Sequence, residues 1–362
     1  MTLYLYGIIF ILIDFILIKS KVKVPPFFFF FGAFLIMGFQ DAIGGDYIGS
    51  KSVYEAVGAG KESYRSDEFI WRALVYFFSK IGAPFWLFIA FQAFINTYII
   101  SKFTGKYIPD RRFWVFAFTL FYFTFNYMMF HMTGMRQSFS IEMCLLSVIL
   151  FDEKKYAPSV ACFIIARFIH SAAIMMVPVI IAIYFLEKSK WLLKSVSNLY
   201  IAIFLIAVFA FAFTNKSLIV DWLVKTVLMQ DMGGFENYIR ELNEDTTANL
   251  IYVYNFILLC LAVYMMLRMD GIYKIFMLMT AISCITSALF VGSGTLYRVF
   301  LYFEIFNVVT IPLIVRYFFK INKAIGIVLI IFFISYAFKT SLPFIQGAQD
   351  YHHYDNYRFI FQ

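Results

Sequence analysis

The chain has 362 residues, of which 62% are apolar or aromatic and only 14% are charged. Soluble domains contain about 45–50% apolar and about 25% charged residues, so this composition excludes an ordinary soluble globular protein. The net charge of +8 comes from cations that stand singly or in small clusters between apolar runs. That pattern carries information about membrane topology and does not resemble a nucleic-acid-binding patch.

Apolar runs recur along the whole chain, most of them near the length of about 20 helical residues that crosses a hydrocarbon core. The sequence therefore predicts an all-α, polytopic integral membrane protein with about 12 transmembrane helices. We expect a single transmembrane domain over 1–340 and an external tail over 341–362. The predicted spans are 2–18, 24–40, 84–101, 113–130, 135–151, 156–169, 171–186, 196–213, 249–267, 273–291, 295–315 and 321–339.

Two stretches leave alternatives open. Residues 156–186 fit either two short helices broken near His170 or one hairpin that does not fully cross. The apolar segment 69–82 is short and contains two cations. If this segment crosses fully, Lys102 lies on the side of the membrane opposite Lys19. If it is a re-entrant or interfacial helix, both lysines lie on the cytoplasmic side, in agreement with the positive-inside bias. We expect the second arrangement, with both termini outside.

Two polar loops are then external, over residues 41–83 and 214–248. In the first, two glycines permit a tight turn that presents Asp46 and Tyr47. Asp46 either stabilises this turn or takes a proton from a sugar hydroxyl. Glu68 precedes the half-helix and is expected to cap its N-terminus.

The second external loop is predicted to begin with an amphipathic helix, around Trp222, that lies flat on the membrane. A glycine pair separates it from a short polar helix. That helix is either a lid or packing element, or a wall for a hydrophilic polymer that Tyr238 and Arg240 contact.

Three arginines, Arg136, Arg167 and Arg298, lie at the outer ends of predicted spans, where the positive-inside bias gives no reason for a cation. Snorkelling to lipid headgroups explains a single such arginine equally well. Three on one side favour a shared anion site, because guanidinium groups bind phosphate oxygens in pairs and stay charged. A pyrophosphate headgroup would suit this cluster.

Other ionisable residues also lie inside or beside apolar runs. His170 follows Arg167 by three residues and shares its helical face if the helix continues that far, so it is either a general base or a structural histidine. Glu142 and Glu304 each lie six residues beyond an arginine. Since a separation of six does not share a helical face, we expect each to pair with another helix.

Several motifs are absent from the sequence: a P-loop, GxSxG, HExxH and DxD. The four cysteines lie in apolar runs without a CxxC spacing, which favours neither disulfides nor a zinc site. The sequence therefore predicts no cofactor and no metal site.

Short motifs along the chain together resemble the EpsG family of Wzy-like polysaccharide polymerases. In chain order they are GGDY (44–47) with Tyr54 and Glu68, MRQSFS (135–140), the Lys154–Lys155 pair, RFIHSAA (167–173) and YRVFLYF (297–303), which includes Tyr302. Two positions depart from the family pattern: Gln40 stands where an arginine is usual, and Ser140 stands where an alanine is expected. A missing phosphate contact would then come from Arg65 or Arg72.

This resemblance implies a multi-pass enzyme of the bacterial inner membrane. Such an enzyme joins oligosaccharide repeat units carried on undecaprenyl pyrophosphate, at the external face and without a metal. Under it, Arg136, Arg167 and Arg298 bind pyrophosphate, and Asp46 or His170 deprotonates the acceptor hydroxyl. Tyr47, Tyr54, Glu68, Tyr238, Arg240 and Tyr302 are candidate glycan or loop contacts. A chain-length regulator is a candidate further partner.

Other functions fit the residues alone. A flippase for lipid-linked oligosaccharides would show paired repeats with broken helices, and no internal repeat is evident. A polysaccharide ligase would use the same donor with a different acceptor. An O-acyltransferase would depend on His131 or His170 and leave the arginines without a role.

Overall fold

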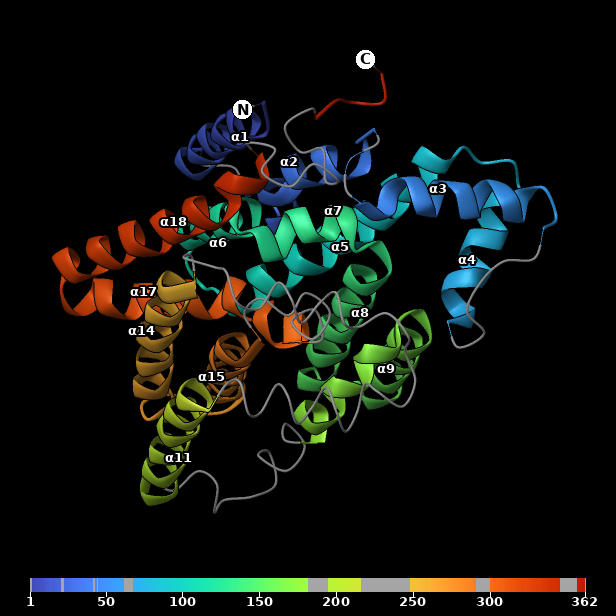
Figure 1. The fold of residues 1–362 in the computed structure, drawn as a ribbon. Coiled ribbons are helices and arrows are strands. Elements are labelled where there is room, and N and C mark those ends of the chain that lie inside the picture. Colours follow the sequence, from blue (N-terminus) through green and yellow to red (C-terminus); the bar gives the residue numbers. More distant parts are fainter. Residues whose placement is uncertain are drawn as a thin grey trace. The chain divides into compact units, whose positions relative to one another are not determined.

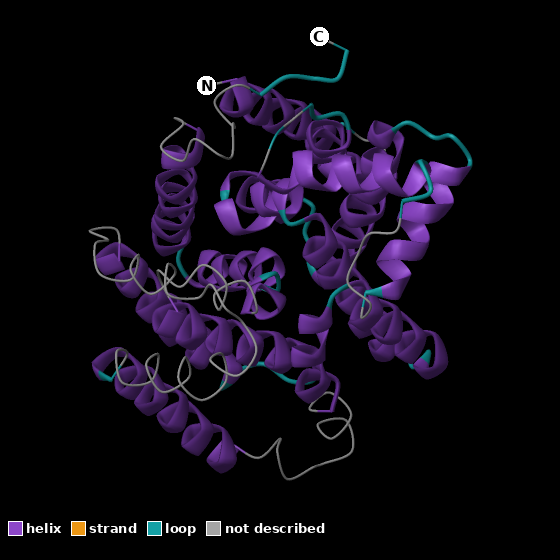
Figure 2. Cartoon of the chain, turned by 45° about the vertical axis from the view of Figure 1, so that its right-hand side comes forward, coloured by secondary structure: helices purple, strands orange, loops and turns teal. Residues whose placement is uncertain are grey.

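The computed structural model of the protein describes residues 2–20, 23–41, 43, 45–61, 68–181, 195–215, 248–290, 300–345 and 357–361. Over these residues the protein is built from helices (Figure 1; Figure 2), and an isolated antiparallel bridge joins Gln40 to Phe359. The predicted all-α fold class is confirmed for this part of the chain.

The chain divides into two compact units, one of residues 1–174 and 311–362 and one of residues 175–310. The single transmembrane domain expected over 1–340 stays a prediction. In the first unit the helices are α1 (Thr2–Lys19), α2 (Pro26–Gly38), α3 (Gly45–Gly58), α4 (Phe69–Lys80), α5 (Phe85–Tyr107), α6 (Arg112–Phe123), α7 (Phe130–Thr133), α8 (Met135–Asp152), α9 (Tyr156–Ile169) and α18 (Lys323–Ile345). The second unit contains α11 (Ser195–Thr214), α14 (Ala248–Met266) and α15 (Ile272–Phe290), and α17 (Asn307–Ile321) contains the boundary.

Every predicted span overlaps a helix, but the count of about 12 crossings is not confirmed. Within the described residues, five helices are long and apolar enough to cross a membrane: 2–19, 85–107, 272–290, 300–321 and 323–343. A sixth crossing results if residues 112–123 and 126–133, which are bent by 58°, form one span. Others are short: the 13 residues of α2 extend about 20 Å, less than the hydrocarbon thickness of about 30 Å.

The first polar loop contains a helix that was not predicted. Helix α3 starts at Gly45, so Asp46 and Tyr47 lie in its first turn, while Gly44 lies outside the described residues. The helix is explained by the helical spacing of Tyr47, Tyr54 and Val57, which places all three on one face that is buried in a hydrophobic cluster.

Helix α4 fits the expected non-crossing helix at 69–82. Its 12 residues extend about 18 Å, too short to cross the membrane. Trp71 and Val75, one turn apart, are buried, while Arg72 on the adjacent face is exposed.

One end of the first unit gathers positive charge, and we call it the basic end. Here Lys106, near the end of α5, forms ion pairs with Asp152 at 2.7 Å and Glu153 at 3.5 Å, so α5 and α8 run in the same direction. Gly105 lies against the ring of Pro26, leaving no room for a Cβ, so α2 begins at this same end. The cations in the adjoining segments are Lys102, Lys106, Arg111, Arg112, Lys154 and Lys155, all assigned to the cytoplasmic loops by the sequence.

The opposite end of the first unit carries the polar loop segments. Helix α8 begins here, because the side chain of Gln92 donates to the carbonyl of Met135 at 2.5 Å. The C-terminal residues 357–361 pack against the residues that follow α2. The backbone N–H of Asp41 donates to the carbonyl of Arg358, and the backbone N–H of Ile360 donates to the carbonyl of residue 39. Helix α18 continues to Ile345, so the first five residues of the predicted tail are helical.

The two ends should face opposite sides of the membrane. In a background in which the four cysteines are replaced, Glu55→Cys should react with an impermeant maleimide in intact cells. Lys155→Cys should react only after permeabilisation, because positively charged loops are retained in the cytoplasm. The reverse labelling would contradict this orientation.

Candidate functional site

Glu68 and Arg136 form an ion pair at the opposite end of the first unit. The Arg136 guanidinium, in the first turn of α8, donates to a carboxylate oxygen of Glu68, which immediately precedes α4. The carboxylate side chain is 2% exposed and that of Arg136 is 24% exposed. The prediction that Glu68 caps α4 is wrong, because its side chain makes no capping bond. A buried carboxylate gains more from a guanidinium than from a backbone N–H.

Arg167 lies close to this pair. Ser140, one turn after Arg136 on α8, donates to the carbonyl of Ala166, the residue before Arg167, at 2.8 Å. The rings of Phe69 and Phe168, which follow Glu68 and Arg167 in sequence, lie 4.4 Å apart. The start of α4, the start of α8 and the end of α9 therefore meet at one place. We call Glu68, Arg136 and Arg167 the arginine cluster.

The cluster has unused capacity to bind an anion. Nη1 of Arg167 is buried and has no hydrogen-bond partner among the described residues. A buried guanidinium N–H without an acceptor is costly, and an anionic oxygen would satisfy it. The three side chains carry two positive charges and one negative charge, which leaves a net charge of +1 for an anion.

His170 does not share a helical face with Arg167. Helix α9 ends at Ile169, and His170 takes an extended conformation with φ −150° and ψ 127°. A 3-10 helix follows at Ser171–Met176, so the predicted break near His170 is present. Residues 182–186 lie outside the described residues, and whether the segment crosses as two helices or forms a hairpin stays a prediction. Nδ1 of His170 accepts a bond from the backbone N–H of Ala172 at 3.4 Å. Its role as a base stays a prediction.

A cleft of about 410 Å³ opens beside α3, and its volume lies in the range of small-molecule sites. Its lining combines aromatic rings with carboxylates and one ammonium group. The lining residues that bear on binding are Asp41, Tyr47, Lys51, Tyr54, Glu55 and Trp86. Two of the predicted contact residues, Tyr47 and Tyr54, are therefore in this cleft, whereas Asp46 is exposed in the first turn of α3 outside its lining.

Tyr47 and Tyr54 line the cleft and also pack in the hydrophobic cluster next to the arginine cluster. Tyr54 donates to the carbonyl of Ala83 at 2.7 Å, and burial raises the pKa of Tyr54 above its ordinary value, so its hydroxyl stays a donor at neutral pH. Tyr47 and Tyr54 share a hydrophobic cluster with Met135 and Ile169, which neighbour the arginine cluster in sequence. Cleft and arginines are thus built around one packed core.

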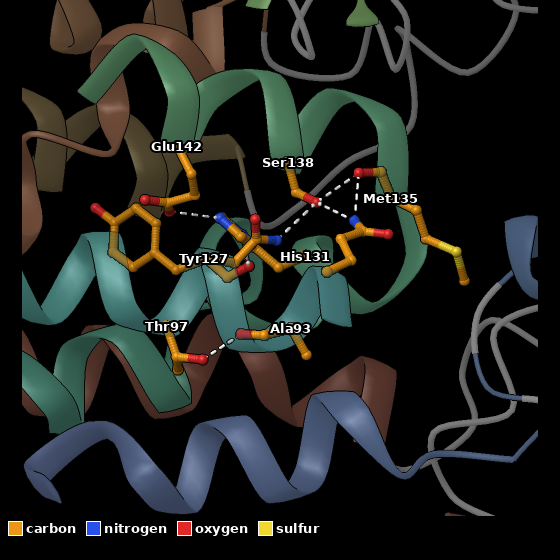
Figure 3. A network of polar contacts seen from close by, with 9 residues as sticks. Ala93, Thr97, Tyr127, His131, Met135, Ser138 and Glu142 are labelled. Atoms are coloured by element: carbon orange, nitrogen blue, oxygen red, sulfur yellow. Dashed lines mark hydrogen bonds and ion pairs between the residues drawn. The ribbon is translucent and has the colours of Figure 1, made fainter. Parts of the chain in front are cut away.

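A second contact between ionisable side chains is buried between α7 and α8 (Figure 3). Nε2 of His131 on α7 is 3.0 Å from Oε1 of Glu142 on α8, and both side chains are almost completely buried. Nδ1 of His131 is 2.6 Å from the carbonyl oxygen of Tyr127, which can only accept, so Nδ1 carries a proton. The prediction that Glu142 pairs with another helix is confirmed.

Several predicted site residues either lie outside the described residues or are not part of the arginine cluster. Arg298, Tyr238, Arg240 and the flat helix around Trp222 lie outside them. Tyr302 is buried within the second unit. Of the two proposed replacements for a missing phosphate contact, Arg65 also lies outside them. Arg72 is exposed on α4, one turn after Glu68.

Sequence reasoning missed Asp41, Lys51, Glu55 and Trp86 in the cleft. Their side chains meet only through the packing of α3 against α5 and the C-terminal residues, for which the local sequence carries no signal. The buried amides Gln92 and Asn96 were also missed, although two amides one turn apart in an apolar run are visible in the sequence.

A family model described as the EpsG family matches residues 3–357. No curated protein and no solved structure matches the chain.

The His131–Glu142 contact predicts a graded response to substitution. Glu142→Leu should lower the free energy of unfolding by about 1–3 kcal/mol, because it leaves a ring nitrogen of His131 buried without a partner. Glu142→Gln should cost less, since an amide can donate to or accept from Nε2. Thermal unfolding in detergent measures both variants, and equal losses would contradict this role of the contact.

Proposed function

The chain belongs to the EpsG family, and we propose that it is a membrane-bound glycosyltransferase, a Wzy-like polysaccharide polymerase. The observation that carries the proposal is that Arg136, Arg167 and a carbohydrate-sized cleft lie around one packed core, at the end of the first unit opposite the basic end. A transfer reaction needs a cationic site for the charged leaving group of the donor beside a site for the acceptor sugar.

The donor is the growing oligosaccharide chain on undecaprenyl pyrophosphate, and the acceptor is the next lipid-linked repeat unit. Arg136 and Arg167 bind the pyrophosphate of the donor, and Arg298 is the third proposed ligand. Their charge stabilises the leaving group as its negative charge grows in the transition state. Guanidinium groups supply this charge without a metal, so we expect the reaction to be metal-independent.

In the reaction, a hydroxyl oxygen of the acceptor sugar attacks the anomeric carbon of the donor. The bond from that carbon to the phosphate oxygen breaks, and its electron pair leaves with the lipid pyrophosphate. The hydroxyl proton goes to a general base. Asp46 and His170 are the bases predicted from the sequence, and the carboxylates of Asp41 and Glu55 in the cleft join them as candidates.

The acceptor sugar binds in the cleft beside α3. Trp86 is partly exposed there and offers an aromatic ring to the apolar face of a pyranose. Asp41, Lys51 and Glu55 supply hydrogen-bonding groups for its hydroxyls. Such sites combine apolar surface with a few placed polar groups.

The proposed setting is the bacterial inner membrane, with the arginine cluster on the external face. The helices that are too short to cross alone, such as α2 and α9, are proposed to complete about 12 spans together with adjoining residues. The lipid-linked oligosaccharide, the membrane lipids and a chain-length regulator are the proposed partners.

Arg136→Ala alone is an ambiguous test, because it leaves the buried carboxylate of Glu68 unpaired and the protein destabilised. The double variant Glu68→Gln/Arg136→Gln removes both charges and should remain folded. Its polymerisation rate should fall about 10²–10³-fold, as expected for the loss of one transition-state charge contact. Gel analysis of lipid-linked glycans should show single repeat units in place of a ladder.

The matched control is Arg112→Gln, which removes an exposed arginine at the basic end and should leave the ladder unchanged. A normal ladder in both the double variant and Arg167→Gln would reject the arginine cluster as the pyrophosphate site. A ladder that forms normally but stays on the lipid after gene deletion would indicate a ligase instead.

A further inference from the structure

Three aromatic rings lie together beside the cleft, at the end of the first unit opposite the basic end. Phe39 follows α2, Trp86 lies in the first turn of α5, and Phe361 belongs to the C-terminal residues. The ring centroids of Phe39 and Phe361 are 5.8 Å apart, those of Phe39 and Trp86 are 6.2 Å apart, and those of Trp86 and Phe361 are 6.4 Å apart. We call these three side chains the aromatic rim.

Hydrogen bonds of the preceding residues hold the segment that carries Phe361. The backbone N–H of Ile360 donates to the carbonyl of Phe39 at 3.0 Å. The hydroxyl of Tyr357 donates to the carbonyl of Ile36 at 2.8 Å, and Tyr357 is only 5% exposed. The place of the Phe361 ring is therefore set by its neighbours in sequence and does not depend on burial of the ring itself.

Phe361 is 75% exposed, the largest exposed fraction among the large apolar side chains of the described residues. Other strongly exposed apolar side chains, such as Ile16 on α1 and Val328 on α18, lie on helices long enough to cross the membrane, where lipid covers them. Phe361 lies outside any helix. An exposed ring that its own backbone fixes in place indicates a surface that packs against another apolar surface.

The aromatic rim is continuous with the cleft beside α3. Trp86 and Ile360 both line the cleft, so Phe361 stands at its edge. The same lining contains the carboxylates of Asp41 and Glu55, which disfavour the acyl chain of a lipid because a charge beside hydrocarbon is costly. Aromatic rings next to polar groups suit a sugar ring, which presents an apolar C–H face as well as hydroxyls.

We propose that the aromatic rim is a second sugar subsite, in which Phe361 stacks on a pyranose ring of the acceptor oligosaccharide, next to the sugar bound at Trp86. This subsite rests on the proposed function and deepens it, because the acceptor site then takes at least two sugar residues. Stacking uses the C–H face of the ring and leaves most hydroxyls without contacts. The rim therefore contributes affinity, while the polar groups of the cleft contribute selectivity.

Calorimetric titration of the purified full-length protein tests the subsite, in a detergent without a sugar headgroup. The probe is the oligosaccharide released by mild acid from the lipid-linked repeat units of the host. Phe361→Leu keeps an apolar side chain but removes the ring, and its affinity should fall about two- to tenfold. Phe361→Tyr keeps the ring and should bind as the wild type does. The control is Phe28→Leu, which replaces a 52% exposed phenylalanine at the basic end and should also bind as the wild type does.

Because the ring of Phe361 is mostly exposed, the variants should keep the unfolding midpoint of the wild type. Wild-type affinity of Phe361→Leu overturns the subsite, since apolar area alone would then be sufficient, as for a ring that only contacts the membrane interface. Absence of oligosaccharide binding by the wild type overturns it as well. Gene deletion tests the proposed function separately: if single repeat units replace the ladder while Phe361→Leu binds normally, the polymerase stands and only the subsite is wrong.

Discussion

The ion pair between Glu68 and Arg136 is the constraint on which the arrangement of the site depends. A carboxylate that is 2% exposed at the edge of a membrane helix is costly unless a cation meets it, so α4 and α8 must begin at the same place. Because Ser140 also ties α8 to the end of α9, Arg167 is brought to the same point. The pair leaves the charge of Arg167 available to an anion.

The ion pairs of the first unit differ in burial between its ends. At the basic end, lysines meet acidic residues in partly exposed ion pairs that contribute at most about 1 kcal/mol each. At the opposite end, the carboxylate of the Glu68–Arg136 pair is only 2% exposed. Removing one partner of a buried pair leaves an uncompensated charge, so this pair constrains the fold more strongly than the exposed ones do.

The helical class and the helix positions follow from apolar runs, because hydrophobicity alone sets where a chain can be buried. That Arg136 and Arg167 deserve attention was visible in the sequence, since a cation at an outer helix end contradicts the positive-inside bias. Their binding role stays a proposal. The partner of Glu68 was not predictable, because 68 residues separate it from Arg136. Helix α3 was missed because its glycines favour turns locally, while its buried face depends on contacts with α5.

The proposed ligand of the arginine cluster is a lipid pyrophosphate. The most direct measurement compares the affinity of the purified protein for a short polyprenyl pyrophosphate and for the corresponding alcohol, in the wild type and in the Glu68→Gln/Arg136→Gln variant. We predict a strong preference for the pyrophosphate in the wild type that is lost or greatly reduced in the variant. An equal preference in both proteins would contradict the claim.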